Sequence, residues 1–475
     1  MFRGIKRSLK YLAILIGIAI LIPSCFYLVI RIPEVQTFIV RRITGNLSDR
    51  IKSTISIGKV DYSFFNKLSL NDVLIKDPYN DTLLYSKKIV AGIRRLDLRK
   101  KIIRLGQVEL TQPYFAMITD TSGLSNLKWY MNLFGQSGGG GEKGKSKSSI
   151  SISQIGIRDG RFLLLNKNRK KSNLAIDFGN IRLSLINGDI NNLRIENDST
   201  LFRVSDLEFA ESGGFILRSM DSRFSFAKNN ISFTNLFLHC DSSIINAERI
   251  ELKPDSAGFK NFVHDVRLDI MLQKSLISTA DLKYFIPAIR GYEESAELSG
   301  RISGTVAELK GREIRLSYGK DTGLECNFDI SGLPRVEDSY IHIGVTSLRT
   351  NARDFENLKA EKIKIPPILF TLGSISFNGS FTGFTNDFVT YGTIGTDMGE
   401  LHTDLSLKPE GKGTRVNGLM SCRNIRLGEL TGKKDLLGNL SMEANVNGYA
   451  SSLKKISGNL TGKIDSVEIN RYIYH

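Results

Sequence analysis

The pattern of apolar and polar residues changes once along the chain, near Ile55. From there onward apolar residues alternate with Ser, Asn, Thr, Arg and Lys at a period of two, which is typical of strands with one apolar face. Asn-Gly, Asp-Gly, Gly-Gly and Asn-Asn pairs recur between these runs as turn signals. The pattern predicts a mainly β chain built as an antiparallel sheet with few short helices.

Before Ile55 the period is helical. The segment from Pro33 to Ile51 carries apolar residues at helical spacing, and Pro33 suits a first turn, so we predict one short amphipathic helix. Its predicted apolar stripe comprises Val35, Phe38, Ile39, Ile43 and Leu47. Two more short helices are predicted, at Leu124–Phe134 and at Leu276–Ile289, the second broken by Pro287.

Residues 135–149 are rich in Gly, Ser and Lys, which predicts a flexible linker or loop. It separates an N-terminal region, residues 33–134, from a repetitive β region, residues 150–475. Within that region Gly300, Gly379 and Gly458 recur 79 residues apart, although the third copy also aligns with Leu437–Gly448. The last alternating run has no Gly, Pro or charged cap, so we expect a longer protein or a partner beyond it.

The first thirty residues predict a membrane anchor. Residues 11–30 are uncharged and about long enough, at roughly 1.5 Å per residue, to cross the hydrocarbon core as a helix. The basic residues within 1–10 place that tail in the cytoplasm and the bulk of the chain on the other side. The expected anchor is represented by Tyr11, Leu15, Ile20, Cys25 and Ile30.

A lipoprotein signal is the competing interpretation of this segment. Ile22-Pro23-Ser24-Cys25 loosely matches the motif at which a signal peptide is cut and the cysteine is lipidated. The apolar run continues beyond Cys25 to Ile30, where a lipoprotein would begin a polar tether. The continuing run favours the uncleaved anchor.

Charge composition restricts the chemical class of partner that the chain can bind. With 65 Lys+Arg against 49 Asp+Glu, the chain has a formal net charge of +16, which favours an anionic partner. A basic cluster lies between Arg94 and Arg104, without the interleaved aromatic residues that nucleic-acid binding uses. We therefore expect a solvated strand edge or contact with anionic lipid head groups, and no nucleic acid.

Candidate catalytic chemistry is sparse. The sequence has no phosphate-binding loop, nucleophile elbow, zinc-protease or dinucleotide motif, so we expect no enzyme, metal or cofactor. Four scattered cysteines favour isolated buried thiols in strands over a Cys240–Cys326 disulfide. Asp77–Asp81 has the composition of a hairpin turn as well as of a calcium loop, and the turn is favoured. Trp129 is expected to pack in a core, and His239, Asp241, His264 and Asp265 to be surface groups.

The order of features resembles the AsmA-like superfamily, in particular its TamB-type members. The similarity covers about the first 185 residues: the anchor, the amphipathic helix, ISIGKVDYSFFNKLSLNDVLIKD from Ile55, a G-x-S-N-L turn and a strand–Asp-Gly–strand unit. The motif residues are Gly123, Ser125, Asn126, Leu127, Asp159 and Gly160. The motifs are structural, and no catalytic residue is implied.

The resemblance implies a protein anchored in the inner membrane of a two-membrane envelope, with an elongated β-sheet groove in the periplasm. Its apolar lining would bind phospholipid acyl chains and carry lipid between the membranes. A scaffold role in assembling outer-membrane proteins, with a barrel protein as partner, is the alternative. A surface-binding lipoprotein is a third hypothesis, and it depends on Cys25. At 475 residues the chain lacks the long remainder that would reach the outer membrane.

Overall fold

A computed structural model describes twelve stretches of the chain. They are residues 32–63, 67–97, 102–130, 149–169, 176–196, 199–227, 229–255, 261–286, 289–356, 367–411, 413–452 and 455–475. Strands make up 69% of the structure and form one open sheet of 22 strands, which confirms the prediction of a mainly β chain with few short helices. The chain divides into two compact units, Met1–Asp221 and Ser222–His475.

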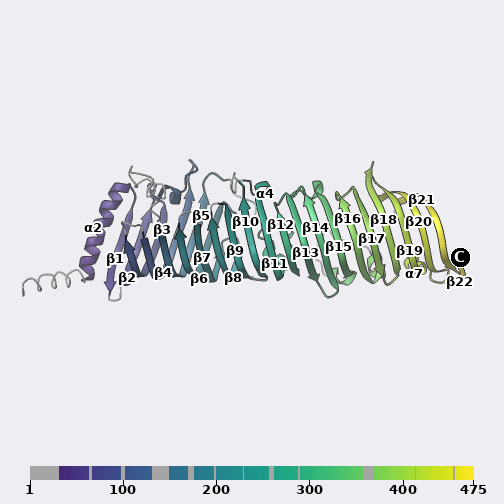
Figure 1. The fold of residues 1–475 in the computed structure, drawn as a ribbon, viewed down its shortest axis with the longest axis horizontal. Helices are drawn as coiled ribbons and strands as arrows, with labels where there is room; N and C mark the ends of the chain where they lie inside the picture. Colours follow the sequence, from purple (N-terminus) through teal and green to yellow (C-terminus); the bar gives the residue numbers. More distant parts are fainter. Residues whose placement is uncertain are drawn as a thin grey trace, which may run out of the picture. The chain divides into compact units, whose positions relative to one another are not determined.

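The described part of the first unit begins with helix α2 and continues as strands that pair in chain order (Figure 1). Its elements are α2 (Pro33–Ile51), β1 (Ile55–Ser63), β2 (Lys67–Lys76), β3 (Thr82–Asp97), β4 (Ile102–Thr119), β5 (Ser149–Asn166), β6 (Asn180–Glu196) and β7 (Ser199–Glu211). β8 (Ile216–Ala227) crosses the boundary between the units.

The second unit is a longer succession of antiparallel strands, each paired with the next from β9 to β22 (Figure 1). Its strands are β9 (Asn230–Cys240), β10 (Ile244–Pro254), β11 (Val266–Ser278), β12 (Ser295–Gly304), β13 (Glu308–Tyr318), β14 (Thr322–Ser331), β15 (Tyr340–Asn351), β16 (Ser374–Gly383), β17 (Phe388–Thr396), β18 (Gly399–Glu410), β19 (Gly413–Arg426), β20 (Leu437–Ser452), β21 (Lys455–Ile469) and β22 (Tyr472–Tyr474). Its short helices are α4 (Phe262–Asp265), α5 (Thr279–Leu282), η2 (Val336–Asp338), η3 (Ala352–Phe355), α6 (Pro367–Leu372) and α7 (Leu427–Thr431).

One strand pair departs from the expected antiparallel order. β4 and β5 are parallel, with Phe115 opposite Phe162 and Val108 opposite Ile155. Parallel neighbours need a crossover of a dozen or more residues, and the segment between Thr119 and Ser149 supplies it. Residues 126–130 of this connection are helical, within the predicted helix Leu124–Phe134. The rest of that prediction and residues 135–148 of the predicted linker lie outside the described residues.

Several expected turns prove to be bulges inside long strands. Asp159-Gly160 lies within β5, where Asp159 has a φ of 55° and the register with β6 shifts. A bulge adds one residue to a strand. The apolar residues on one face of β5 therefore stand at odd positions just before the bulge, such as Ile155, and at even positions after it, such as Phe162. Asn187-Gly188 lies within β6 in the same way. The strands are therefore longer than the turn signals indicated.

The predicted helix Leu276–Ile289 is largely wrong. Leu276 belongs to β11, where it lies opposite Ile244 of β10 and Glu297 of β12. The regular helix here is only α5, whose first turn is capped by the Ser278 hydroxyl accepting from the Ala280 amide. Pairing on both edges of β11 stabilises the strand more than its helical periodicity could stabilise a helix. Pro287 lies outside the described residues.

The structure also decides between the two repeat alignments. A helical connection precedes β12, β16 and β20, namely α5, η3 with α6, and α7. Gly300 and Gly379 lie on β12 and β16, but Gly458 lies on β21. The competing third copy, Leu437–Gly448, lies on β20 and therefore follows the helical connection as the first two copies do.

Helix α2 has the predicted bounds. The face that it turns toward the sheet is not the predicted apolar stripe but the polar face opposite to it. The side facing β1 includes Thr37 and Ser48 as well as Ile51. Thr37 Oγ1 accepts from the Val60 amide (3.0 Å), and Ser48 Oγ accepts from the Ile55 amide (2.9 Å). Arg41 donates to the Gly58 carbonyl. β1 pairs only with β2 among the described strands, so polar side chains of α2 satisfy the other edge of β1.

The described part of the chain has little enclosed core. One cluster of buried residues, Ile51, Leu83 and Tyr130, lies beside α2, with Leu127 and Trp129 packed against it, as expected for Trp129. None of the described phenylalanines is buried, although Phe is among the residues most often found inside globular proteins. Within each unit the extensive contacts of a strand are with its hydrogen-bonded neighbours or an adjoining helix. Among the residues that the structure describes, no second layer covers the sheet in either unit.

The predicted anchor, including Tyr11, Leu15, Ile20, Cys25 and Ile30, lies outside the described residues. From residue 32 onward, the described part of the chain contains no helix long and apolar enough to cross a membrane.

Candidate functional site

The apolar face of the sheet is the most extensive candidate surface. In an antiparallel ladder, directly opposite residues project from the same face, so the register identifies rows that cross many strands. One row in the second unit crosses β12 to β21 and is apolar at every position. It consists of Leu298, Leu316, Leu324, Leu348, Phe377, Ile394, Leu401, Cys422, Met442 and Ile464.

A second row of the same face runs four residues further along each of β14 and β16. It consists of Phe233, Ile250, Ile270, Ile302, Gly311, Phe328, Ile343, Phe381, Thr390, Leu405, Gly418, Val446 and Leu460. Leu324 and Phe328 are both on β14, and an even spacing in a regular strand keeps them on one face. We call these two rows the apolar ladders.

Between the apolar ladders lies a row of smaller residues. From β14 to β20 its small residues are Cys326, Gly379, Gly392, Thr403 and Ala444, and the larger Val345 and Met420 complete it. Cys326, Thr403 and Ala444 are buried although no second layer of the described chain covers them. Atoms of the Phe377 ring lie within 3 Å of where side chains on Gly379 and Gly392 would begin, so ladder side chains lean over the small row.

The opposite face of the sheet is polar and carries paired charges. Asp269 of β11 lies between Arg249 of β10 and Arg301 of β12, with oxygen–nitrogen distances of 3.1 and 3.0 Å. Arg312 and Asp329 form another cross-strand pair at 2.9 Å. These ion pairs are partly exposed, and each contributes little to stability. They show which face of the sheet is the solvated one.

The first unit repeats the apolar pattern. One row contains Ile55, Ile75, Leu84, Phe115, Phe162 and Leu183, on six successive strands. The rings of Phe115 and Phe162 are stacked with centroids 6.0 Å apart. Sequence reasoning found the alternation but not these rows, because register is a property of pairing and not of one strand.

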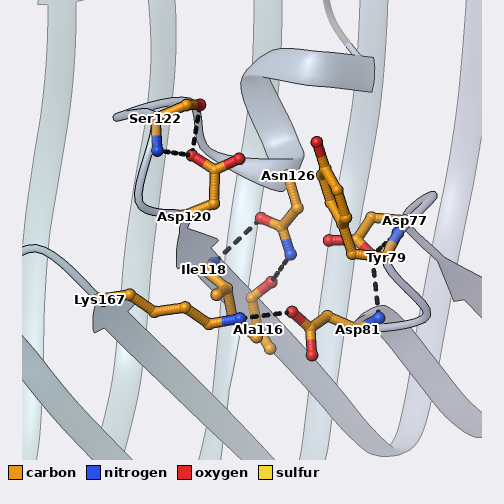
Figure 2. A network of polar contacts seen from close by, with 9 residues as sticks. All are labelled: Asp77, Tyr79, Asp81, Ala116, Ile118, Asp120, Ser122, Asn126 and Lys167. Carbon is orange, nitrogen blue, oxygen red and sulfur yellow. Dashed lines mark hydrogen bonds and ion pairs between the residues drawn. The ribbon is translucent and has the colours of Figure 1, made fainter.

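The G-x-S-N-L turn forms a polar anchor at the end of β4 (Figure 2). Asn126 is 4% exposed, and its side-chain oxygen accepts from the Ile118 amide (3.0 Å) while its nitrogen donates to the Ala116 carbonyl (2.9 Å). β3 pairs with β4 only as far as Phe115, so Asn126 substitutes for the missing strand partner. Each contact satisfies a backbone group that would otherwise be costly to bury.

The rest of this motif shapes the turn. Gly123 has a φ of 85°, which favours glycine, and Ser125 Oγ accepts from the Lys128 amide at the start of the short helix. Leu127 packs against the buried cluster. The Ser122 hydroxyl and nearby backbone amides donate to Asp120 and lower the pKa of that carboxyl.

The Asp77–Asp81 segment is a hairpin turn, as favoured from the sequence, and adjoins this anchor (Figure 2). Asp77 accepts from the amides of Tyr79 and Asp81, both at 2.9 Å. Burial raises the pKa of the Asp77 carboxyl, and Lys167 lies 3.0 Å from Asp81. A pocket of about 420 Å³ lies between these groups and Trp129. Among the described residues no three acidic, His or Cys side chains lie close enough together to hold a metal ion.

The Asp159-Gly160 motif forms the bulge of β5. The Asp159 amide donates to Asn187 (2.8 Å), and Gln112 donates to the Asp159 carboxylate (3.0 Å). A side chain on Gly160 would begin 2.9 Å from a methyl group of Ile157, which requires glycine. The structure thus brings the G-x-S-N-L residues together but places Asp159 and Gly160 on a separate strand.

The remaining candidates are dispersed. Cys240, Cys326 and Cys422 are buried free thiols on three different strands, as favoured from the sequence, and no Cys240–Cys326 disulfide forms. Arg95 and Arg104 lie opposite each other on β3 and β4, while the middle of the basic cluster lies outside the described residues. His239 is on β9, whereas His264 and Asp265 are on α4.

Comparison with known proteins adds no relative. No protein-family profile, curated protein or solved structure matches this chain. The AsmA-like resemblance therefore stays a prediction that rests on the quoted residues. The apolar ladders are the feature from which a function can be argued.

Proposed function

We propose that this protein binds the acyl chains of phospholipids on its apolar face and moves lipid between the membranes of a two-membrane envelope. One observation carries the proposal: the apolar ladders extend across many strands, and no second layer of described residues lies over them. An apolar surface of this extent on a soluble domain marks a binding site for another apolar surface.

The proposed transport is passive and needs no catalytic group or cofactor. Sheltering acyl chains from water contributes about 25 cal/mol per Å² of apolar area. Because the ladders repeat at each strand, a chain moving along the face exchanges equivalent contacts and meets a low barrier. Head groups would stay at the rims in water, since the ladder side chains, Thr390 excepted, are apolar and offer them few hydrogen bonds.

A groove is the form of sheet that we propose for this face. The buried small row between two rows of large side chains supports it, because a concave face brings the flanking side chains together over its centre. The inner membrane is the proposed site of attachment, through the predicted anchor at residues 11–30, with the sheet in the periplasm.

Scaffolding of outer-membrane protein assembly, with a barrel protein as partner, remains the alternative. It uses strand edges and leaves the apolar ladders without a role. Lipid contact confined to one face distinguishes the two proposals.

The test uses the photoreactive amino acid p-benzoylphenylalanine in the full chain. Placed at Phe381, on the apolar ladder of β16, it should crosslink to phospholipid in envelope membranes. Thr382 is the matched control, because it adjoins Phe381 on the same strand and projects from the polar face opposite His342. Crosslinking of Phe381 to protein alone, or equal lipid crosslinking at both positions, would refute lipid binding by the apolar face.

A further inference from the structure

The outward face of helix α2 is apolar and faces no other part of the described chain. Phe38 is 71% exposed, Ile43 60% and Ile39 41%, whereas Gln36 and Thr37 are buried. This inversion is not a packing fault, because the inward polar side chains satisfy the edge of β1. The helix is therefore fixed to the sheet by hydrogen bonds and presents its apolar side outward.

The exposed apolar side chains that the structure describes on this face lie in the first half of the helix. They run from Ile32 to Ile43, and the exposed residues that follow, among those whose side chains the structure describes, are polar or small: Gly45, Asn46 and Asp49. Exposed apolar side chains in the N-terminal half of a helix suit partial immersion from that end. A second copy packed along the whole helix would bury those polar residues.

The position of this face along the chain identifies its occupant. Only Arg31 and Ile32 separate the uncharged segment of residues 11–30 from Pro33. A chain that leaves a bilayer at residue 30 has its next helical turns at the lipid–water interface. Arg42, exposed within the same face, can reach lipid phosphates at that depth.

We propose that the N-terminal half of α2 lies in the interfacial zone of a phospholipid bilayer, with Phe38, Ile39 and Ile43 among the acyl chains. The helix then has two roles: it covers the edge of β1 and holds the first strands of the sheet against the membrane. This inference rests on the proposed anchor at residues 11–30, and it does not depend on lipid moving along the sheet.

The first test measures tryptophan depth in the full chain. In a Trp129→Phe background, Phe38→Trp supplies a single reporter on α2. Tyr79→Trp is the matched control, because Tyr79 is equally exposed, at 72%. Tyr79 lies in the turn that follows β2, whereas the α2 residues next to Phe38 contact β1 beside the first half of β2. In vesicles of phosphatidylcholine and phosphatidylglycerol with brominated acyl chains, we expect loss of fluorescence for Phe38→Trp and not for Tyr79→Trp.

Iodide should give the reverse order, quenching the Tyr79→Trp reporter and sparing the Phe38→Trp reporter. If the Phe38→Trp reporter in vesicle-bound protein is quenched by iodide and not by brominated lipid, the proposal is overturned. Protection from both quenchers would also overturn it, since a second copy or another segment of the chain would then cover the helix.

A second measurement avoids the Trp129→Phe substitution. p-Benzoylphenylalanine at Phe38 in the otherwise unchanged chain should crosslink to phospholipid, and the same group at Tyr79 should not. Crosslinking at Phe38 only to protein would contradict the proposal. Because lipid contact at Phe381 is scored separately, attachment by α2 and binding by the apolar ladders can fail independently.

Discussion

At the scale of single residues, side chains in this protein replace missing strands. Asn126 forms hydrogen bonds with the backbone of β4 beyond the point where its pairing with β3 stops. Thr37 and Ser48 of α2 form hydrogen bonds with the outer edge of β1. Each satisfies backbone groups that a closed sheet would satisfy by pairing. The amino-acid sequence marks Asn126 only as part of a turn, because its partners are backbone atoms eight and ten residues away.

Asn126→Ala should loosen the end of β4. The substitution leaves the Ile118 amide and the Ala116 carbonyl without their partner, at about 1–3 kcal/mol for each buried group. We expect hydrogen exchange in residues 114–130 to accelerate by about 30-fold, which corresponds to about 2 kcal/mol of local opening. Lys128→Ala, an exposed change in the same helical turn, should leave the exchange rate unaltered. Equal rates in the two variants would show that Asn126 has no such role.

Cys240 should react slowly with thiol reagents. Burial, with the nearby Asp281 carboxylate, raises the pKa of its thiol from 9.0 to about 11, and the thiolate is the reactive form. At pH 8 we expect Ellman's reagent to modify Cys240 about 100-fold more slowly in the folded chain than in urea. Because folding disfavours the thiolate, its ionisation lowers stability as pH rises from about 9 toward 11. Rapid modification of the folded chain, mapped by mass spectrometry, would contradict this assignment.

At the scale of elements, bulges and glycines keep one face of each strand apolar. Asp159-Gly160 changes the alternation phase within β5, and Gly379 faces Gly392 across β16 and β17. A methyl group on Gly379 would overlap the Tyr391 carbonyl oxygen and lie 2.6 Å from the Gly392 Cα atom. A one-residue error of phase would turn apolar residues to the polar face.

Gly379→Ala should therefore destabilise β16 and β17 by about 1–3 kcal/mol, the usual range for overpacking. The same substitution at Gly344 of β15 is the control, because nothing lies within 4 Å of its would-be side chain. We expect amide exchange at β16 and β17 to rise only in Gly379→Ala. A larger effect at Gly344 would mean that lost backbone freedom, rather than overlap, decides the outcome.

At the scale of the molecule, stability is local because strands contact mainly their neighbours. In such an array, stability approximates a sum over units and the contacts between adjacent ones. For Gly379→Ala we expect the rise in amide exchange to decline from β16 and β17 toward β10 and to be absent from β1–β4. A uniform rise over all described strands would show one cooperative transition instead. Exchange measured by mass spectrometry on peptides from each strand gives the profile.

The sequence by itself determined the class of fold, the bounds of α2, the buried cysteines and the packing of Trp129. These follow from local periodicity and from the aversion of apolar groups to water, both of which one strand or helix expresses alone. The predicted anchor and the AsmA-like resemblance were also drawn from it and remain predictions.

Only the tertiary structure decided which residues share a row, that β4 and β5 are parallel, and that Leu276 belongs to a strand. It also turned the apolar side of α2 outward. The physical reason is the same in each case: these features depend on partners distant in sequence. The hydrogen-bond needs of an edge strand decided the orientation of α2 against its own apolar stripe.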